Sequence, residues 1–135
     1  MSTAANTPWR WVDKRMLMLL HDESLAQHGG LSGLRDEGLL DSALARPQNL
    51  ATYGDPDLAA LSASYAFGLV RNHPFVDGNK RAAFLGVGLC LGLNGWRLTA
   101  GQAEATVAVL ALAGSEIGED EFAAWLREHL APRGR

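Results

Sequence analysis

Cysteine is nearly absent from this sequence, because Cys90 is the one thiol among 135 residues. A single cysteine cannot close a disulfide within the chain, and such low usage fits the reducing cytosol. A chain of this length is the size of one domain and can bury a core without metals or disulfides. We therefore expect a domain over 9–131, with a flexible leader over 1–8 and a flexible tail over 132–135.

Long apolar runs are missing as well. The longest, over 82–93, falls well short of the roughly 20 residues that a membrane span needs. The first ten residues, MSTAANTPWR, lack the basic start and apolar stretch of a secretory signal. These absences predict a cytoplasmic protein with no membrane partner.

An excess of positive charge is also lacking, since 12 Lys and Arg residues face 15 Asp and Glu residues, for a net charge of −3. Proteins that bind nucleic acid broadly usually show a basic excess, so no direct nucleic-acid partner is expected. The composition, 47% hydrophobic and 20% charged, is that of an ordinary globular protein.

Helical periodicity and cap signals dominate the chain, and they predict an all-α single domain of about six helices. The helices are expected over about 13–27, 36–46, 55–72, 79–93, 100–113 and 119–130. Pro47 is expected to end the second helix, and Thr99 with Gln102 forms a capping-box pattern before the fifth. Strand-like residues occur at 50–53 and 96–99.

Two segments of this all-α domain stand out. The fourth helix, about 79–93, is apolar all the way round, which predicts a central, buried position. The segment 47–57, PQNLATYGDPD, is rich in turn formers and is expected to be an exposed loop or a small hairpin.

The stretch NHPFVDGNKRAAF, residues 72–84, gathers polar chemistry at the start of the fourth helix. The unpaired N–H groups and dipole of a helix N-terminus favour an anion, and Gly78 lets a ligand approach the backbone. Lys80 and Arg81 are unfavourable there unless an anion compensates them. Together with Arg71 they put three positive charges against Asp77.

His73 and Asp77 complete a set of groups suited to phosphate chemistry. An imidazole with a pKa of about 6.5 suits proton abstraction, and a carboxylate is a hard ligand of the kind Mg²⁺ uses beside phosphate oxygens. A base, a metal carboxylate and an anion site are the parts of a phosphoryl- or nucleotidyl-transfer site. No Walker pattern is present.

Ordinary structural roles remain open for each of these residues when each is considered alone. Asp77 has the character of a turn or helix cap, and a histidine before proline is commonly an ordinary loop residue. Lys80 and Arg81 can equally be solvated side chains. Residue types and spacing therefore leave the catalytic and the structural interpretation about equal.

The motif HPFVDGNKR, at 73–81, resembles the signature of the Fic/Doc family, in the form found in its death-on-curing members. The resemblance extends over LHDESLAQHGGLSGLRDEGLLDSALARPQ, at 20–48, and LNG, at 93–95. It implies the helical Fic/Doc fold and an enzyme that uses ATP and Mg²⁺ to modify a protein hydroxyl group.

The resemblance also implies a role for each residue of the motif. His73 would be the catalytic base, Asp77 would hold Mg²⁺, and Phe75 would anchor the loop in the core. The nucleotide phosphates would be bound at four positions: Gly78, Asn79, Lys80 and Arg81. The segment 47–57 would be the flap that aligns a target segment by main-chain pairing.

Two positions depart from the pattern of the family members that transfer AMP. Lys80 replaces their second glycine, and Phe84 stands where they carry an arginine. The departures imply transfer of the γ-phosphate to a Ser or Thr hydroxyl, a kinase activity. By analogy with the death-on-curing members, the chain would be a toxin that blocks translation by modifying the elongation factor EF-Tu. Transfer of AMP is the alternative.

Self-inhibition is not expected. Family members that restrain themselves carry Ser or Thr four residues before Glu-Gly or Glu-Asn. Here the pair is Glu37-Gly38, and the residue four positions before Glu37 is Gly33. Restraint would then come from a small antitoxin resembling Phd, which would contribute a helix to a groove near the active site.

Two other classes of protein, a phosphohydrolase and a binding module, share single features with this sequence. His21-Asp22 is the dipeptide of HD phosphohydrolases, and His28 follows near the same helix face. No companion set of ligands accompanies it, so ordinary polar helix residues are favoured. A binding module that has lost catalysis would have no physical need for all four of His73, Asp77, Asn79 and Arg81.

Overall fold

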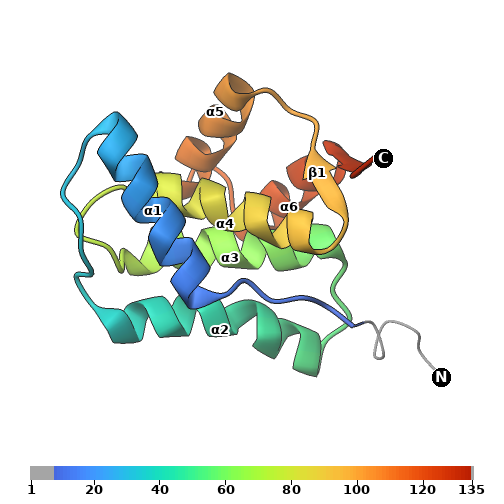
Figure 1. Cartoon of the computed structure of the whole chain (residues 1–135). Helices are drawn as coiled ribbons and strands as arrows, with labels where there is room; N and C mark the ends of the chain where they lie inside the picture. Colours follow the sequence, from blue (N-terminus) through green and yellow to red (C-terminus); the bar gives the residue numbers. More distant parts are fainter. Residues whose placement is uncertain (1–7, 135) are drawn as a thin grey trace.

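The computed structural model describes residues 8–134, which form six helices and a two-stranded sheet (Figure 1). This confirms the all-α class expected from the sequence. The elements are α1 (Lys14–His28), α2 (Glu37–Tyr53), α3 (Leu58–Asn72), α4 (Asn79–Leu93), β1 (Trp96–Leu98), α5 (Gln102–Ala113), α6 (Glu119–Arg127) and β2 (Leu130–Pro132). Residues 1–7, most of the expected leader, and Arg135 lie outside the described part.

Aspartate side chains cap the first three helices, each by accepting a hydrogen bond from a main-chain N–H three residues on. The bonds join Asp13 to Met16 at 3.1 Å, Asp36 to Leu39 at 3.0 Å and Asp57 to Ala60 at 2.9 Å. The sequence predicted two of these starts, but it placed the third at Asp55, two residues too early.

Asp57 also receives two hydrogen bonds from Arg127, Nε at 2.6 Å and Nη2 at 3.0 Å, so it ties α3 to α6. Asp57→Ala should lower the free energy of unfolding by about 1–2 kcal/mol, because a helix cap and an exposed ion pair are both lost. Urea denaturation measures this. Asp55→Ala, at an exposed carboxylate next to the same helix start, is the matched control and should change little.

The effect of Asp57→Ala should depend on pH. The hydrogen bond from Arg127 holds the pKa of the Asp57 carboxyl below its usual value. The stabilisation is therefore complete above the unfolded pKa of about 4 and is lost as the pH falls through the lower folded pKa. An effect that stayed constant down to pH 2 would contradict this assignment.

The most buried helix is α3. Eleven of its 15 residues are buried, against seven of the 15 in α4. In Figure 1, α3 lies between α2 and α4, with α6 behind it. One side of α4 packs against α3 as expected, but Leu93 is 41% exposed, so α4 is buried on one face only. An apolar helix surface alone does not say which helix has neighbours on every side.

The expected end of the second helix at Pro47 is wrong. Pro47 lies inside α2, and the helix continues to Tyr53, so residues 50–53 form no strand. A proline inside a helix costs about 3 kcal/mol, but the ring of Pro47 is fully buried, and this burial offsets the cost. The loop or hairpin expected over 47–57 is reduced to residues 54–57.

The C-terminal part contains one expected strand and one that the sequence did not predict. β1 pairs antiparallel with β2, and Leu98 is opposite Leu130. The main-chain N–H of Thr99 extends this ladder by donating to the His129 carbonyl at 2.7 Å, and the expected capping box does not form, because Gly101 caps α5. Helix α6 ends at Arg127, before the expected end near residue 130, because the chain from Leu130 onwards forms β2.

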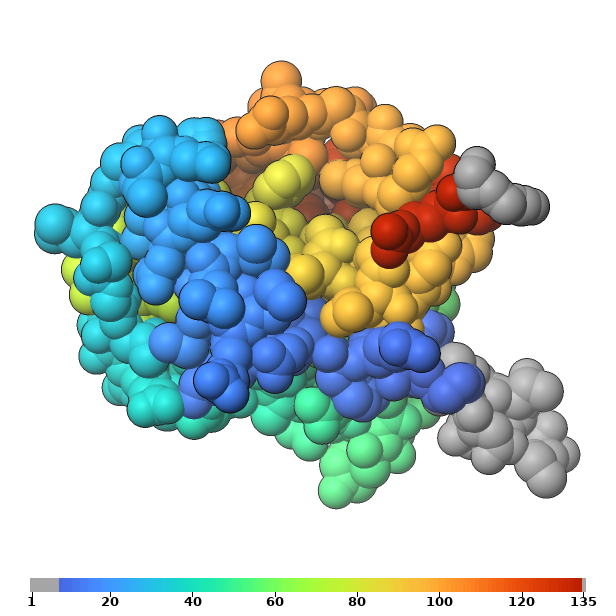
Figure 2. All heavy atoms as spheres, viewed as in Figure 1, coloured from blue at the N-terminus to red at the C-terminus, as the bar shows by residue number. Residues whose placement is uncertain are grey.

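Helices α1, α4 and α5 surround a recess on one face of the molecule. Figure 2 shows α4 (yellow) at the bottom of this recess, with α1 (blue) on one side and α5 (orange) on the other. Within residues 8–134, no helix combines the length and the apolar character that crossing a membrane requires.

Candidate active site

The loop between α3 and α4, residues 73–78, is bounded by two residues in the left-handed conformation. His73 ends α3 with φ 49° and ψ 55°, and Gly78 starts α4 with φ 72° and ψ 29°. Glycine adopts this conformation freely, whereas a histidine needs external support. The loop must therefore be held in place by other parts of the chain.

Residues 33–36, just before α2, provide part of this support. The N–H of Val76 donates to the Gly33 carbonyl at 3.0 Å, and the N–H of Arg35 donates to the Pro74 carbonyl at 2.7 Å. The side chain of Arg35 donates to the carbonyls of His73 at 2.6 Å and Asn72 at 2.7 Å. Arg35 thus holds the backbone of His73, a role that no sequence signal indicated.

Asn79 supports the loop from the other side. Its amide group accepts from the Phe75 N–H at 2.9 Å and donates to the Phe75 carbonyl at 3.0 Å. It also lies 3.4 Å from Nδ1 of His73, a weak contact. Because this side chain is used within the loop, Asn79 can serve an anion only through its main-chain N–H. Phe75 itself is 3% exposed and packs in the core, as expected.

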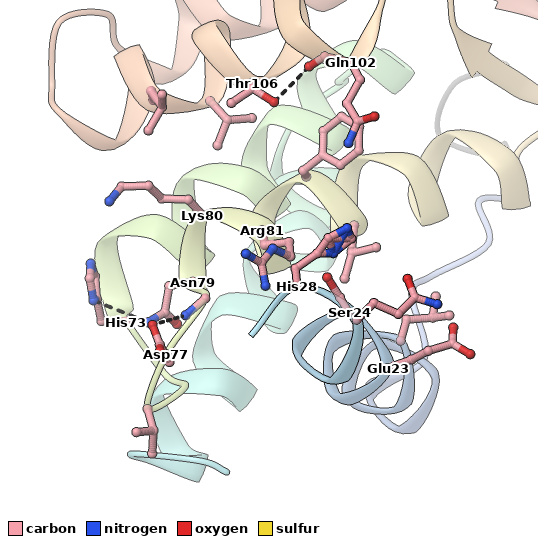
Figure 3. A pocket seen from close by; sticks show the side chains of 18 residues that line it. Glu23, Ser24, His28, His73, Asp77, Asn79, Lys80, Arg81, Gln102 and Thr106 are labelled. Carbon is pink, nitrogen blue, oxygen red and sulfur yellow. Dashed lines mark hydrogen bonds between the residues drawn. The ribbon is translucent and has the colours of Figure 1, made fainter. Parts of the chain in front are cut away.

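The start of α4 has the features of an anion site. Gly78 provides no side-chain cap, so within the described chain the first-turn N–H groups lie free at the positive end of the helix dipole. In Figure 3, Arg81 is directed towards α1 and His28, whereas Lys80 extends to the side where His73 lies. The two cations therefore flank the helix start.

Asp77 lies at the mouth of this site and is exposed. Its Oδ1 accepts from the Gly78 N–H at 2.9 Å, and its Oδ2 accepts from the Leu31 N–H at 3.2 Å. Between residues 8 and 134, no three His, Cys, Asp or Glu side chains come together as a metal site. The Asp77 carboxylate is therefore an isolated oxygen donor and not part of such a cluster.

These residues line a cavity of about 790 Å³ between α1, α4 and α5. It brings together His73, Asp77, Gly78, Asn79, Lys80 and Arg81, as the sequence predicted, with Phe84 beside them. The walls add polar side chains that sequence analysis missed. They are Glu23, Ser24, Gln27 and His28 of α1, and Gln102 and Thr106 of α5.

Two expected contributors do not reach the cavity. Arg71 donates to Ser115 Oγ at 2.6 Å and lies over the Phe67 ring. No residue of 47–57 is among the lining residues, and Figure 1 shows that end of α2 far from the loop before α4, so this segment is not a flap over the site. The lining therefore has Lys80 and Arg81 against Glu23 and Asp77, without the expected positive excess.

The HD-phosphohydrolase interpretation of His21-Asp22 finds no support in this geometry. His21 is fully buried, and burial lowers its pKa, so the imidazole is neutral near pH 7. Its Nε2 lies 2.9 Å from the Asp77 carbonyl oxygen. Asp22 and His28 are exposed, so the histidine serves the loop described above and not a metal.

The loop before α4 lies in the part of the chain that matches a known protein family. The model of the Fic/DOC family matches residues 11–91, which include α1 to α3, the loop and most of α4. The chain is 36% identical over 87 residues to "Protein kinase doc" of Escherichia phage P1, covering 64% of this chain and 69% of that protein. It is 45% identical over 75 residues to "Toxin Doc" of Mycolicibacterium smegmatis, covering 53% of this chain and 57% of that protein.

Proposed function

Because the chain belongs to the Fic/Doc family, we propose that it is a Doc-type toxin that transfers the γ-phosphate of ATP to a Ser or Thr hydroxyl group of a target protein. The names of the two relatives, a protein kinase and a toxin, support this class of function. The observation that favours transfer of the γ-phosphate over transfer of AMP is the presence of both Lys80 and Phe84 in the lining of the cavity.

Lys80 and Phe84 favour γ-phosphate transfer for steric and electrostatic reasons. A lysine side chain at the family's second glycine position occupies space along the phosphate path used in AMP transfer. The aromatic ring of Phe84 offers no charge to a phosphate at the position where AMP-transferring members carry an arginine. The tail phosphates of a nucleotide bound as for AMP transfer would lose a partner. We therefore propose that the nucleotide binds in the inverted orientation, with its γ-phosphate towards the target hydroxyl.

His73 is the proposed base. It would accept the proton of the target hydroxyl while the hydroxyl oxygen forms a bond to the γ-phosphorus, and the bond from that phosphorus to the bridging oxygen of ADP breaks. The developing charge on the phosphate oxygens would be stabilised by the first-turn N–H groups of α4 and by Arg81. The hydrogen bonds from Arg35 keep the backbone of His73 in place for this step.

Asp77 is the proposed ligand for Mg²⁺, and its environment fits that ion. Mg²⁺ is commonly held by one or two carboxylates together with substrate phosphates and water. Asp77 presents one exposed carboxylate next to the anion site. When bound there, the ion would neutralise charge on the phosphates. The protein's own part is to orient the carboxylate through Gly78 and Leu31.

A Phd-like antitoxin and EF-Tu as the target are the proposed partners. Position 33 is a glycine, so the chain lacks the inhibitory Ser or Thr of self-restrained family members. Apolar side chains at the rim of the cavity, such as Leu110 at 48% exposure, offer a surface for an antitoxin helix. The choice of EF-Tu as the target rests on analogy with the family's death-on-curing members.

The test is to incubate the chain with Mg²⁺, purified EF-Tu or bacterial lysate, and ATP labelled at either the α or the γ phosphate. We expect a protein band labelled only from γ-labelled ATP and lost in His73→Ala. Label from α-labelled ATP would mean AMP transfer and would overturn the argument from Lys80 and Phe84. If EF-Tu is not labelled but another protein is labelled from γ-labelled ATP, the proposed target is wrong and the proposed reaction stands.

A further inference from the structure

His21 is a buried polar residue that contacts the active-site loop from α1. Its Nε2 lies 2.9 Å from the Asp77 carbonyl oxygen. A carbonyl can only accept, so Nε2 carries the proton, and Nδ1 is left unprotonated. Within the described chain Nδ1 is buried and has no hydrogen-bond partner.

The ring of His21 touches three of the loop's residues. Besides the bond to Asp77, it packs against the Phe75 ring, with centroids 4.1 Å apart. It also lies directly beneath Gly78, since a Cβ placed at Gly78 would come within 2.8 Å of Cε1 of His21. One side chain from α1 therefore fills the space under the segment that starts α4.

An unpartnered ring nitrogen argues that His21 is not kept for packing alone. Burying a polar atom without a partner costs free energy, and an apolar side chain of the same shape would avoid that cost. The donor on the other side of the ring must therefore contribute something that an apolar residue cannot, namely the bond to the Asp77 carbonyl.

We infer that His21 is a positioning residue that orients the Asp77–Gly78 peptide and, through it, the Asp77 carboxylate. The peptide unit is planar, so holding its carbonyl oxygen also sets the direction of the Gly78 N–H. That N–H donates to Asp77 Oδ1 at 2.9 Å. The inference rests on the proposed function, in which this carboxylate holds Mg²⁺.

The test compares His21→Phe, which keeps a ring but removes the donor, with His21→Gln, whose amide can restore it. We expect His21→Phe to raise the Mg²⁺ concentration needed for ATP binding, and the KM for ATP, by about tenfold or more, as loss of a supporting hydrogen bond does at other metal sites. His21→Gln should recover most of this loss. Asp22→Ala, at the exposed neighbour, should match the wild type. Equal binding by the Phe and Gln variants, per folded molecule, would overturn the inference.

Nuclear magnetic resonance separates this inference from the proposed function. In the ¹⁵N-labelled wild type we expect the His21 ring proton on Nε2, and in His21→Phe a shifted Gly78 amide signal that His21→Gln returns towards its wild-type position. A ring proton on Nδ1, or an unmoved Gly78 signal in His21→Phe, would refute the positioning role. Both signals report on His21 even if the chain transfers no phosphate, and the ring-proton signal is read in the wild type, so it does not depend on the folding of a variant.

Discussion

His73→Asn should reduce the rate of phosphate transfer by at least about 100-fold and leave the fold and the affinity for ATP nearly unchanged. The imidazole is the proposed base, and an amide cannot take the proton of the target hydroxyl. Asparagine is chosen because His73 has φ 49°, a left-handed conformation that asparagine tolerates better than most residues. Single-turnover transfer from γ-labelled ATP and thermal unfolding measure the two properties.

Comparison with His73→Ala distinguishes chemistry from conformation. Alanine also lacks the base but has no local polar group to support the left-handed backbone, so it should unfold about 1 kcal/mol more easily than the asparagine variant. Both variants should be equally inactive. Because the lost interaction forms in the transition state, kcat should fall while KM for ATP stays near its wild-type value. A His73→Asn variant with a third or more of the wild-type rate would show that another group is the base.

Gly78→Ala should destabilise the protein by about 2–4 kcal/mol and reduce transfer by about 100-fold. Part of the cost arises because φ is 72°, where a Cβ is strained. The rest arises because the new Cβ would lie 2.8 Å from Cε1 of His21 and 3.2 Å from Cδ2 of Leu25, both on a buried face of α1. Relief of this overlap would move the start of α4 away from its present place, and displacements of about 1 Å in a site cost about this factor in rate.

Gly88→Ala is the matched control on the same helix. Gly88 is exposed, and a Cβ there would meet nothing within 4 Å. Alanine in place of a helical glycine should stabilise the fold by about 0.5–1 kcal/mol, with no effect on transfer. Urea denaturation and the labelled-ATP assay apply to both variants. A Gly78→Ala protein as stable and active as Gly88→Ala would mean that the loop adapts to a side chain at residue 78.

The sequence by itself determined the features that depend on neighbouring residues. The starts of α1 and α2 were predicted at Asp13 and Asp36, because an aspartate cap bonds to an N–H only three residues away. The start and end of α4 were also predicted, since Gly78 and Asn94-Gly95 interrupt the helix locally. The loop residues His73, Asp77, Lys80 and Arg81 lie within nine positions, so their meeting in one cavity required no knowledge of the fold.

Only the tertiary structure decided the features that depend on packing between distant segments. Pro47 remains in a helix because its ring is buried, and α3 rather than α4 is the more completely buried helix. Arg71, two positions before the motif, was expected at the site, but it donates a hydrogen bond to Ser115 instead. Arg35 and His21 support the loop across 38 and 56 positions of sequence, respectively. Their contacts depend on how α1 and α2 pack against the loop, which no local pattern of residues encodes.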